Sequence, residues 1–194
     1  AIGLILFGIM NYAGNKITEE IDRELRPKFN AMGADYESIE AHPAKGALTF
    51  HGLTYEQNEV DELTITSKFE DLVAFAQGNA KELHGLDIQL SGGTLGDGAE
   101  TIEMGDAHIS FDALIDLELL QSNPNQYLTN LLLQDDLYLV FEGQDLFLKM
   151  GDLQRALGRK TNGGIRLDSW SGSLSKEGEA LEVSWDMESP DLGD

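Results

Sequence analysis

The hydrophobic pattern changes its period along the chain. Residues 1–14 are almost entirely apolar, and Asn11 is their one clearly polar side chain. Four apolar residues then recur at every fourth position among charged ones, namely Ile17, Ile21, Leu25 and Phe29. A spacing of four places side chains on one face of an α-helix. The sequence therefore predicts an apolar helix that continues as an amphipathic helix to about residue 32.

The apolar segment is predicted to be a membrane anchor. A helix rises about 1.5 Å per residue, so this segment reaches about 21 Å of a hydrocarbon layer of about 30 Å, and we expect the chain to begin before residue 1. No small-residue cleavage site follows, which favours an uncleaved anchor over a signal peptide. A buried core helix is the alternative for so short a run. The residues expected to contact lipid are Ile2, Leu4, Ile5, Leu6, Phe7, Ile9 and Met10.

Small and apolar residues of the same helix are candidates for packing against a partner helix. They are Gly3, Gly8, Ile17, Ile21 and Leu25. Small residues allow two helices to approach closely, although the glycines here do not form a G-x-x-x-G motif. Pro27 is expected to bend the helix near residues 23–27, and Gly33 is a plausible terminator.

From residue 33 the pattern alternates with a period of two, which predicts β-strands. A short helix is expected at Phe69–Ala76, ended by Gly78, and Gly92–Gly98 is interpreted as a wide turn that cradles neither phosphate nor Ca²⁺. The strands are predicted around Tyr36–Ile39, Leu48–Leu53, Val60–Ile65, Ala107–Phe111, Leu137–Phe141, Leu146–Met150, Ile165–Leu174 and Leu181–Met187, with another short helix at Asp152–Leu157.

A short internal echo suggests repeated units. His51-Gly52-Leu53 reappears as His84-Gly85-Leu86, and each copy is followed by further alternation. Repetition of this kind favours an elongated sheet with short helices laid on it. The predicted fold class is thus α+β, with a membrane-anchoring helix in residues 1–32 and a β-rich domain of meandering antiparallel strands in residues 33–194.

Charge separates the two regions. Residues 1–32 carry four basic and four acidic residues, so the whole formal charge of −22 belongs to residues 33–194. An acidic field repels nucleic acid and anionic head groups, and we expect no nucleic-acid partner. Basic patches on other membrane protein subunits are the expected partners, beside the bilayer itself. With no cysteine in the chain, disulfides and thiol catalysis are excluded.

No motif in the sequence predicts an enzyme, a cofactor or a metal site. The four histidines, His42, His51, His84 and His108, form no H-x-x-x-H pattern and are interpreted as surface or structural residues. Three acidic pairs are interpreted as parts of a solvated acidic face, namely Asp135 with Asp136, Asp112 with Asp116, and Asp186 with Glu188. Trp170 and Trp185 on the last hairpin are expected to pack as core, with a binding face as the alternative.

Three segments together resemble the AsmA-like envelope proteins of Gram-negative bacteria. After the N-terminal helix come "GALTFHGLTY", an early strand pair, and the strand-to-helix segments "KFEDLVAFAQG" and "SFDALIDLELLQ". The resemblance implies an inner-membrane anchor with a β-rich periplasmic body, and in some members a hydrophobic groove for lipid. This chain is short for a bridge across the envelope.

The sequence favours a non-catalytic, single-pass membrane protein whose periplasmic domain acts as a scaffold or accessory subunit of a membrane assembly. An AsmA-like lipid-handling protein is the first alternative. A pilin-like filament subunit is the second, because pilins also join an apolar N-terminal helix to a β-rich head. Ile5 stands where many type IV pilins keep a Glu, which weakens that alternative.

Overall fold

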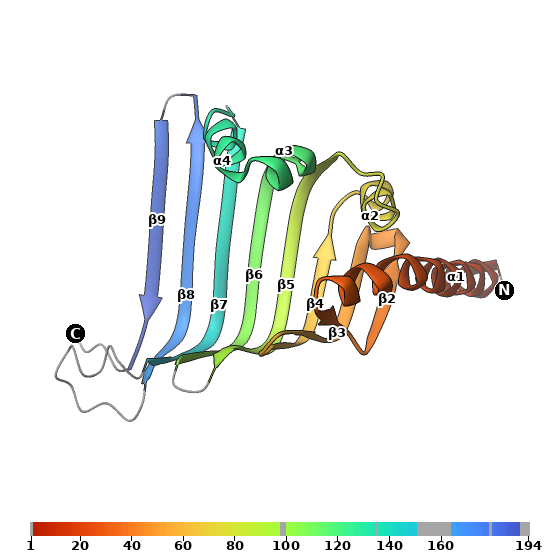
Figure 1. The fold of residues 1–194 in the computed structure, drawn as a ribbon, viewed down its shortest axis with the longest axis horizontal. Helices are drawn as coiled ribbons and strands as arrows, with labels where there is room; N and C mark the ends of the chain where they lie inside the picture. Colours follow the sequence, from red (N-terminus) through yellow and green to blue (C-terminus); the bar gives the residue numbers. More distant parts are fainter. Residues whose placement is uncertain (1, 98–99, 135, 151–163, 179, 191–194) are drawn as a thin grey trace.

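The computed structural model describes residues 2–97, 100–134, 136–150, 164–178 and 180–190, which form one N-terminal helix, one sheet and three short helices (Figure 1). The helices are α1 (Ile2–Ala31), α2 (Phe69–Ala76), α3 (Leu117–Ser122) and α4 (Pro124–Leu132), and η1 (Pro43–Lys45) is a single 3-10 turn. The strands are β1 (Ala34–Asp35), β2 (Ser38–His42), β3 (Ala47–Tyr55), β4 (Asn58–Thr66), β5 (Glu82–Asp97), β6 (Glu100–Asp116), β7 (Asp136–Met150), β8 (Gly164–Glu177) and β9 (Ala180–Glu188).

The sheet is an antiparallel meander. From β3 to β9 every strand pairs with the next one along the chain, and β1 and β2 both pair with β3 at the opposite edge. Alternation with a period of two and short connections predicted this arrangement, because consecutive antiparallel strands need only tight turns. The α+β class and the meandering antiparallel sheet are confirmed, as is the short helix at Phe69–Ala76.

Two expectations about the strands were wrong. The segment Gly92–Gly98 was expected to be a wide turn, but β5 runs through it to Asp97, because its glycines allow the strand to bend while it stays paired. Two strands were expected within residues 137–150, but β7 is continuous there. The helix expected at Asp152–Leu157 lies outside the described residues.

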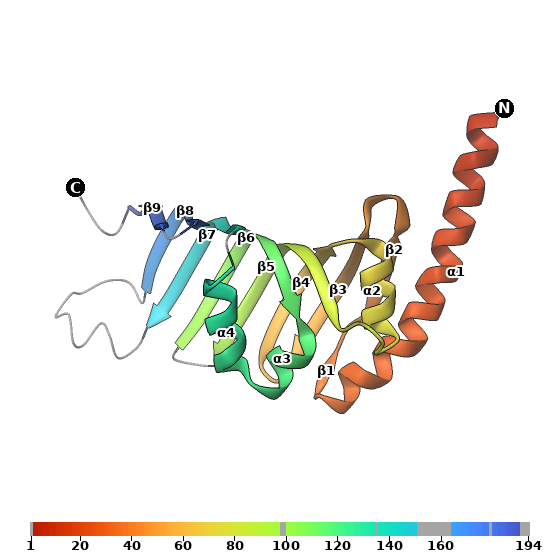
Figure 2. The same ribbon diagram turned by 90° about the horizontal axis from the view of Figure 1, so that it is seen from above.

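Helix α1 continues through Pro27, which lies inside it, and ends at Ala31. Figure 2 shows the helix changing direction toward its C-terminal end, as expected for a helix that loses one backbone donor. Its N-terminal part extends beyond the edge of the sheet. Across the described residues, none of the helices combines the length and the apolar character that a bilayer crossing requires.

The C-terminal half of α1 is held to the sheet by aromatic packing and one polar cluster. The rings of Phe29, Tyr36 and Phe50 pack on one another with centroids 5.3–5.5 Å apart. The Tyr36 hydroxyl donates to the Asp22 carboxylate at 2.7 Å, and Arg26 donates to the Tyr36 carbonyl at 2.9 Å. Burial, together with the Asp22 hydrogen bond, raises the pKa of Tyr36. These contacts fix the helix against the first strands.

A row of residues bends all the long strands at the same level, and we call this row the crease. In register it runs through Gly52, Asp61, Gly92, Gly105, Asp145 and Asp168. The backbone has φ of 58° at Gly52, 68° at Gly92 and 54° at Asp145, so one strand of each hairpin carries a left-handed residue. Figure 2 shows the strand ends beyond the crease turned toward the side of the sheet on which α3 and α4 lie.

The crease shifts the phase of the apolar pattern. Across it, inward apolar residues are three positions apart instead of two, as in Phe50 then Leu53, Val60 then Leu63, and Leu167 then Trp170. Leu53 packs against the core that holds Phe50, and Leu167 and Val60 are buried. The sheet therefore keeps one apolar face on both sides of the bend.

We predict that Gly92→Ala lowers the free energy of unfolding by about 2–3 kcal/mol, because it combines left-handed strain with crowding. A Cβ at Gly92 would overlap the Asp61 carboxylate and lie 2.9 Å from its Cγ. Gly33→Ala is the matched control, since Gly33 has φ of 79° but no atom within 4 Å of the added carbon. Urea unfolding measures the free energy of unfolding of both variants. Equal losses of stability in the two variants would contradict crowding at the crease.

Candidate functional site

One face of the sheet, which we call the inner face, is apolar from one edge to the other. Two rows of paired residues cross it without a charged side chain. The first row is Ala41, Leu48, Ile65, Ile88, Ile109, Phe141, Gly172 and Trp185. The second row is Ile39, Phe50, Leu63, Leu90, Ala107, Gly143, Trp170 and Met187. Such rows place the side chains of neighbouring strands in contact on one face.

Helices cover only part of this face. Ile21 and Leu25 of α1 and Leu72 of α2 are buried against β2 and β3. Tyr127 of α4 is buried with Leu83 and Ile115 at the ends of β5 and β6. Beyond these contacts the inner face is partly open, and Ile109 remains 39% exposed although it lies in the middle strand of the sheet. The partly open region runs from β4, where Leu63 and Ile65 are partly exposed, to β9.

Local signals position the two covering helices, α3 and α4. The Asp116 carboxylate accepts the backbone N–H of Leu119 and so caps α3. Asn123 accepts the N–H of Gln126, and Pro124 follows it as the first residue of α4. Side-chain caps of this type satisfy backbone donors that the helix leaves free. Asp116, expected only as a solvated acid, has this structural role.

Glycines make room for two large rings on the inner face. A Cβ at Gly172 would overlap the ring of Phe141, and the ring of Trp170 lies over Gly143. The two rings have centroids 6.0 Å apart. The rings of Phe141 and Trp170 therefore each lie over a glycine of the neighbouring strand, which places two aromatic side chains at this end of the inner face.

The expectation that both tryptophans pack as core was wrong for Trp185. Its side chain is 75% exposed, since β9 is the last strand and Gly172 opposite it has no side chain. Val183, its neighbour on the same face, is 70% exposed. The alternation of apolar and polar residues revealed the strand but could not show that its apolar side is uncovered.

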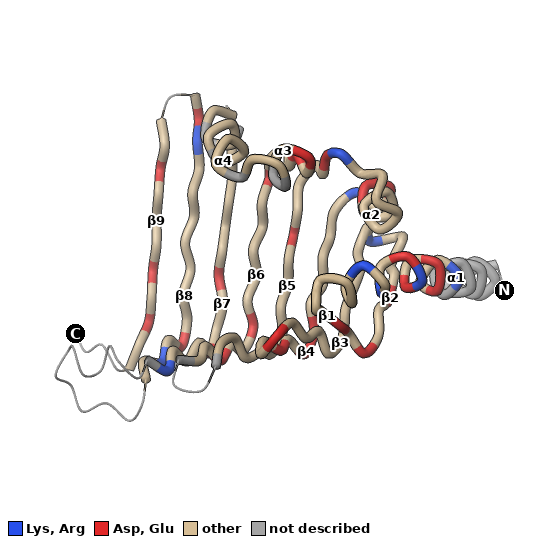
Figure 3. Tube along the Cα trace, in the orientation of Figure 1, with Lys and Arg blue, Asp and Glu red and all other residues tan. Residues whose placement is uncertain are grey.

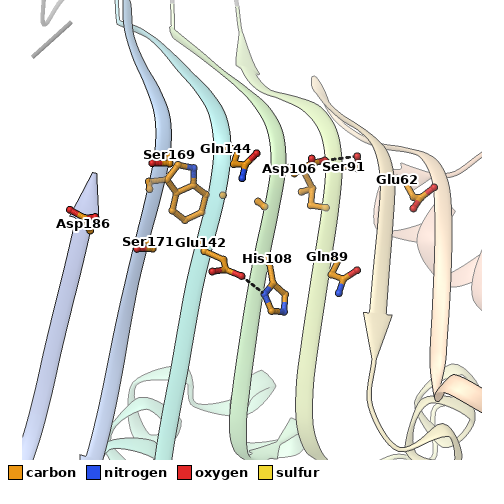
Figure 4. A pocket seen from close by; sticks show the side chains of 14 residues that line it. Glu62, Gln89, Ser91, Asp106, His108, Glu142, Gln144, Ser169, Ser171 and Asp186 are labelled. Atoms are coloured by element: carbon orange, nitrogen blue, oxygen red, sulfur yellow. Dashed lines mark hydrogen bonds and ion pairs between the residues drawn. The ribbon is translucent and has the colours of Figure 1, made fainter. Parts of the chain in front are cut away.

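The opposite, outer face is polar and carries a shallow cavity of about 490 Å³ (Figure 4). His108 of β6 lies there between two carboxylates. Its Nε2 is 2.6 Å from Asp87 of β5, and its Nδ1 is 3.1 Å from Glu142 of β7. The hydrogen bond with Asp87, and then that with Glu142, raises the pKa of His108 against the opposing effect of burial.

Each of the four histidines lies beside at least one carboxylate. Both ring nitrogens of His108 are taken by carboxylates, so the imidazole has no free nitrogen to act as a base. His51 has Glu40 and Glu62 within 3.7 Å, and His84 is 3.4 Å from Asp71. Within the described ranges, no group of three or more His, Asp or Glu could hold a metal ion. The contacts of His51 and His108 thus join adjacent strands, and the contact of His84 joins β5 to α2.

Charge is divided between the faces and the ends of the molecule. Figure 3 shows Asp and Glu along the strands, whereas Lys and Arg gather mainly around α1 and α2. In the described part of the sheet, the inner-face positions of the paired rows contain no carboxylate. The acidic residues of the described strands therefore lie on the outer face, at the crease or at the strand ends.

The residues expected to pack against a partner helix have mixed positions. Ile21 and Leu25 are buried, and Ile17 is partly buried, within the protein's own core beside α2 and the sheet. Gly3, Gly8 and the residues expected to contact lipid lie in the N-terminal part of α1.

Comparisons with known proteins identify no relative. No family model matches the sequence, and neither curated proteins nor solved structures include a significant match. The resemblance to AsmA-like proteins stays a prediction.

We predict that His108 titrates above the ordinary histidine pKa of about 6.5 in the folded protein. Asp87→Asn should lower that pKa more than Glu142→Gln does, because the Asp87 hydrogen bond is the larger cause. NMR titration of the imidazole protons measures each value, with Glu70→Gln, at an exposed position of α2, as a control of equal charge change. A His108 pKa unchanged in Asp87→Asn would contradict the arrangement.

The same shift sets the sign of a pH effect on stability. A raised folded-state pKa means that the native state holds the proton more tightly than the unfolded chain. The contribution of His108 is then fully present below about pH 6.5 and is lost as pH rises through the folded-state pKa. Asp87→Asn should reduce the stability that is lost as pH rises from about 6.5 through the folded-state pKa. Urea unfolding at a series of pH values across this interval measures the loss.

Proposed function

We propose that the inner face binds the acyl chain of a lipid. The observation that carries this proposal is an apolar surface without carboxylates that runs across the sheet from β4 to β9 and is only partly covered by helices. A soluble protein seldom exposes a large continuous apolar patch unless something binds there. The strand ends beyond the crease and the helices α3 and α4 lie on the same side of the sheet (Figure 2). We call the part of the inner face between them the trough.

The size of the trough suits an acyl chain. From β4 to β9 there are five strand-to-strand intervals, which at about 4.8 Å each give a length of about 24 Å. One leaflet of a bilayer contributes about half of a hydrocarbon layer of about 30 Å, so a lipid chain needs about 15 Å. A chain lying across the strands would therefore contact several of them.

The chemistry of the inner face favours an unfunctionalised hydrocarbon. Its side chains are aliphatic and aromatic, and they offer a ligand no row of hydrogen-bond partners. Among the strand residues that the structure describes, Lys176 is the one basic residue on this face, and its Nζ donates to the Gln134 carbonyl at 3.0 Å. A polar head group would therefore remain in solvent at the open side, while the chain replaces water on the apolar side.

The N-terminal part of α1 supports a location at a membrane. It is apolar in sequence, and it projects past the edge of the sheet. If this part of α1 inserted into a bilayer, it would hold the trough near a source of lipid. This combines the anchor with the lipid-binding alternative, and the AsmA-like resemblance points the same way. The role of accessory subunit and the pilin-like role stay predictions.

The test is lipid binding by the purified protein. Native mass spectrometry after gentle detergent extraction should find bound phospholipid, and a fluorescent phospholipid should bind with saturation. The double variant Ile102→Gln and Ile109→Gln removes one apolar side chain on each side of the crease, and both are more than a third exposed. We expect the dissociation constant to rise by about tenfold or more, which corresponds to about 1.4 kcal/mol of lost apolar contact.

The control exchanges two apolar residues that lie outside the trough and are more exposed than Ile102 and Ile109. Met32→Gln with Leu133→Gln alters side chains that are 63% and 69% exposed at helix ends. Lipid binding should be unchanged in this variant. The proposal would be wrong if both double variants weakened lipid binding equally, or if the protein bound no lipid.

A further inference from the structure

The edge strand β9 presents an unpartnered surface to solvent. It is the last strand of the sheet, and all nine of its residues, Ala180–Glu188, are exposed. On its outward side, half of the backbone N–H and C=O groups have no strand partner among the described residues. A free row of such groups is the template on which an extended chain adds to a sheet.

The side chains of β9 divide into two chemically different stripes. Leu181, Val183, Trp185 and Met187 lie on the inner face, as continuations of its apolar rows. Glu182, Asp186 and Glu188 lie on the outer face, together with Ala180 and Ser184. Alternation of this kind fixes the register of any strand that pairs here, because a slip by one residue would bring apolar against charged side chains.

The carboxylates of β9 have no basic partner on the neighbouring strand. Ser175 pairs with Glu182, Ser171 pairs with Asp186, and Ser169 donates to Glu188 at 3.1 Å. The ion pairs found among the described residues include none of these three acids. Their charge is therefore uncompensated within the described part of the protein.

Lys, Pro and a β-bulge, three devices that protect edge strands, are missing from β9. Natural edges carry Lys, Pro or a bulge that blocks pairing. The segment Ala180–Glu188 contains neither Lys nor Pro, and it pairs with β8 in continuous register. Its nine residues therefore form an open and regular edge.

A second copy of this chain fits the edge poorly. Full antiparallel pairing of two β9 strands would be centred on Ser184, so Glu182 of each copy would lie opposite Asp186 of the other. Like charges directly opposite each other destabilise a strand pair. A partner strand with basic residues at those positions would instead be attracted.

We propose that β9 is a docking edge for an extended segment of a partner protein in which Lys or Arg alternates with apolar residues. The segment pairs with the free backbone groups of β9. Its apolar side chains cover Val183 and Trp185, and its basic side chains meet Glu182 and Asp186. This inference does not depend on lipid binding, since it rests on the edge and its two stripes.

The experiment uses two synthetic peptides of equal length, one alternating Lys with Val and one alternating Glu with Val. Fluorescence anisotropy with the full chain, at an ionic strength of about 0.15 M, should detect binding of the Lys peptide only. The variant Glu182→Lys with Asp186→Lys should weaken that binding by about tenfold. The control variant Glu59→Lys with Glu70→Lys has the same net charge at exposed sites, and should change binding by less than about twofold.

A second measurement distinguishes strand addition from general attraction to an acidic protein. Two further Lys peptides carry N-methyl groups on alternate residues, on the odd positions in one and on the even positions in the other. Pairing along one edge requires only one of these two sets of N–H groups, so one peptide should bind and the other should not. Hydrogen exchange at β9 amides should slow when the unmodified peptide binds.

Three results would each overturn the proposal. If the two charge-reversal variants weakened binding of the Lys peptide equally, the effect would depend on net charge and not on β9. Equal binding of both methylated peptides, or of neither, would exclude pairing along the edge. A stable dimer of the protein alone in sedimentation, broken by Trp185→Lys, would show that a second copy occupies β9.

Discussion

The bend at the crease is the constraint on which the rest of the structure depends. Six strands must turn at one level while they remain paired, so the residues that allow the turn must lie opposite one another. Glycine adopts positive φ without steric cost, and Asp tolerates it better than most residues. The row from Gly52 to Asp168 is built from these two residue types alone. Where each strand turns, the apolar pattern shifts by one position, so the inner face stays apolar on both sides.

Packing at the two ends of the sheet is unequal, and this inequality defines the open surface. At the β2 edge, α1 and α2 bury Ile21, Leu25 and Leu72 and leave little of the sheet uncovered. At the β9 edge, the described residues place no element over Val183 or Trp185. The acidic residues lie elsewhere, so a charge of −22 coexists with an apolar trough without repelling an uncharged chain. The outer face supplies solubility, and the histidine and carboxylate contacts on it join adjacent strands.

Sequence patterns predicted local structure well and long-range consequences poorly. The period of four predicted α1, and the period of two predicted most of the strands, because both periods reflect which face of an element is covered. Gly92–Gly98 was misread as a turn since glycine is equally suited to a turn and to a bend within a paired strand. The i to i+3 step from Leu167 to Trp170 was a visible signal of the crease. Exposure of Trp185 had no such signal, because it depends on which strand is last in the sheet.

The edge and the trough meet at β9, and their proximity has an energetic consequence. A strand paired with β9 would add its own apolar side chains to the inner face and lengthen the trough by about 4.8 Å. It would also cover Trp185 and Val183, which in the free protein face water. An acyl chain reaching β9 would gain contacts from that strand, and the strand would gain contacts from the chain. By linkage each ligand then raises the affinity of the other by the same factor. Lipid bound over β4 to β6 alone would contact neither β9 nor the strand paired with it. The strength of the coupling between lipid binding and strand binding therefore depends on how far along the trough the acyl chain extends.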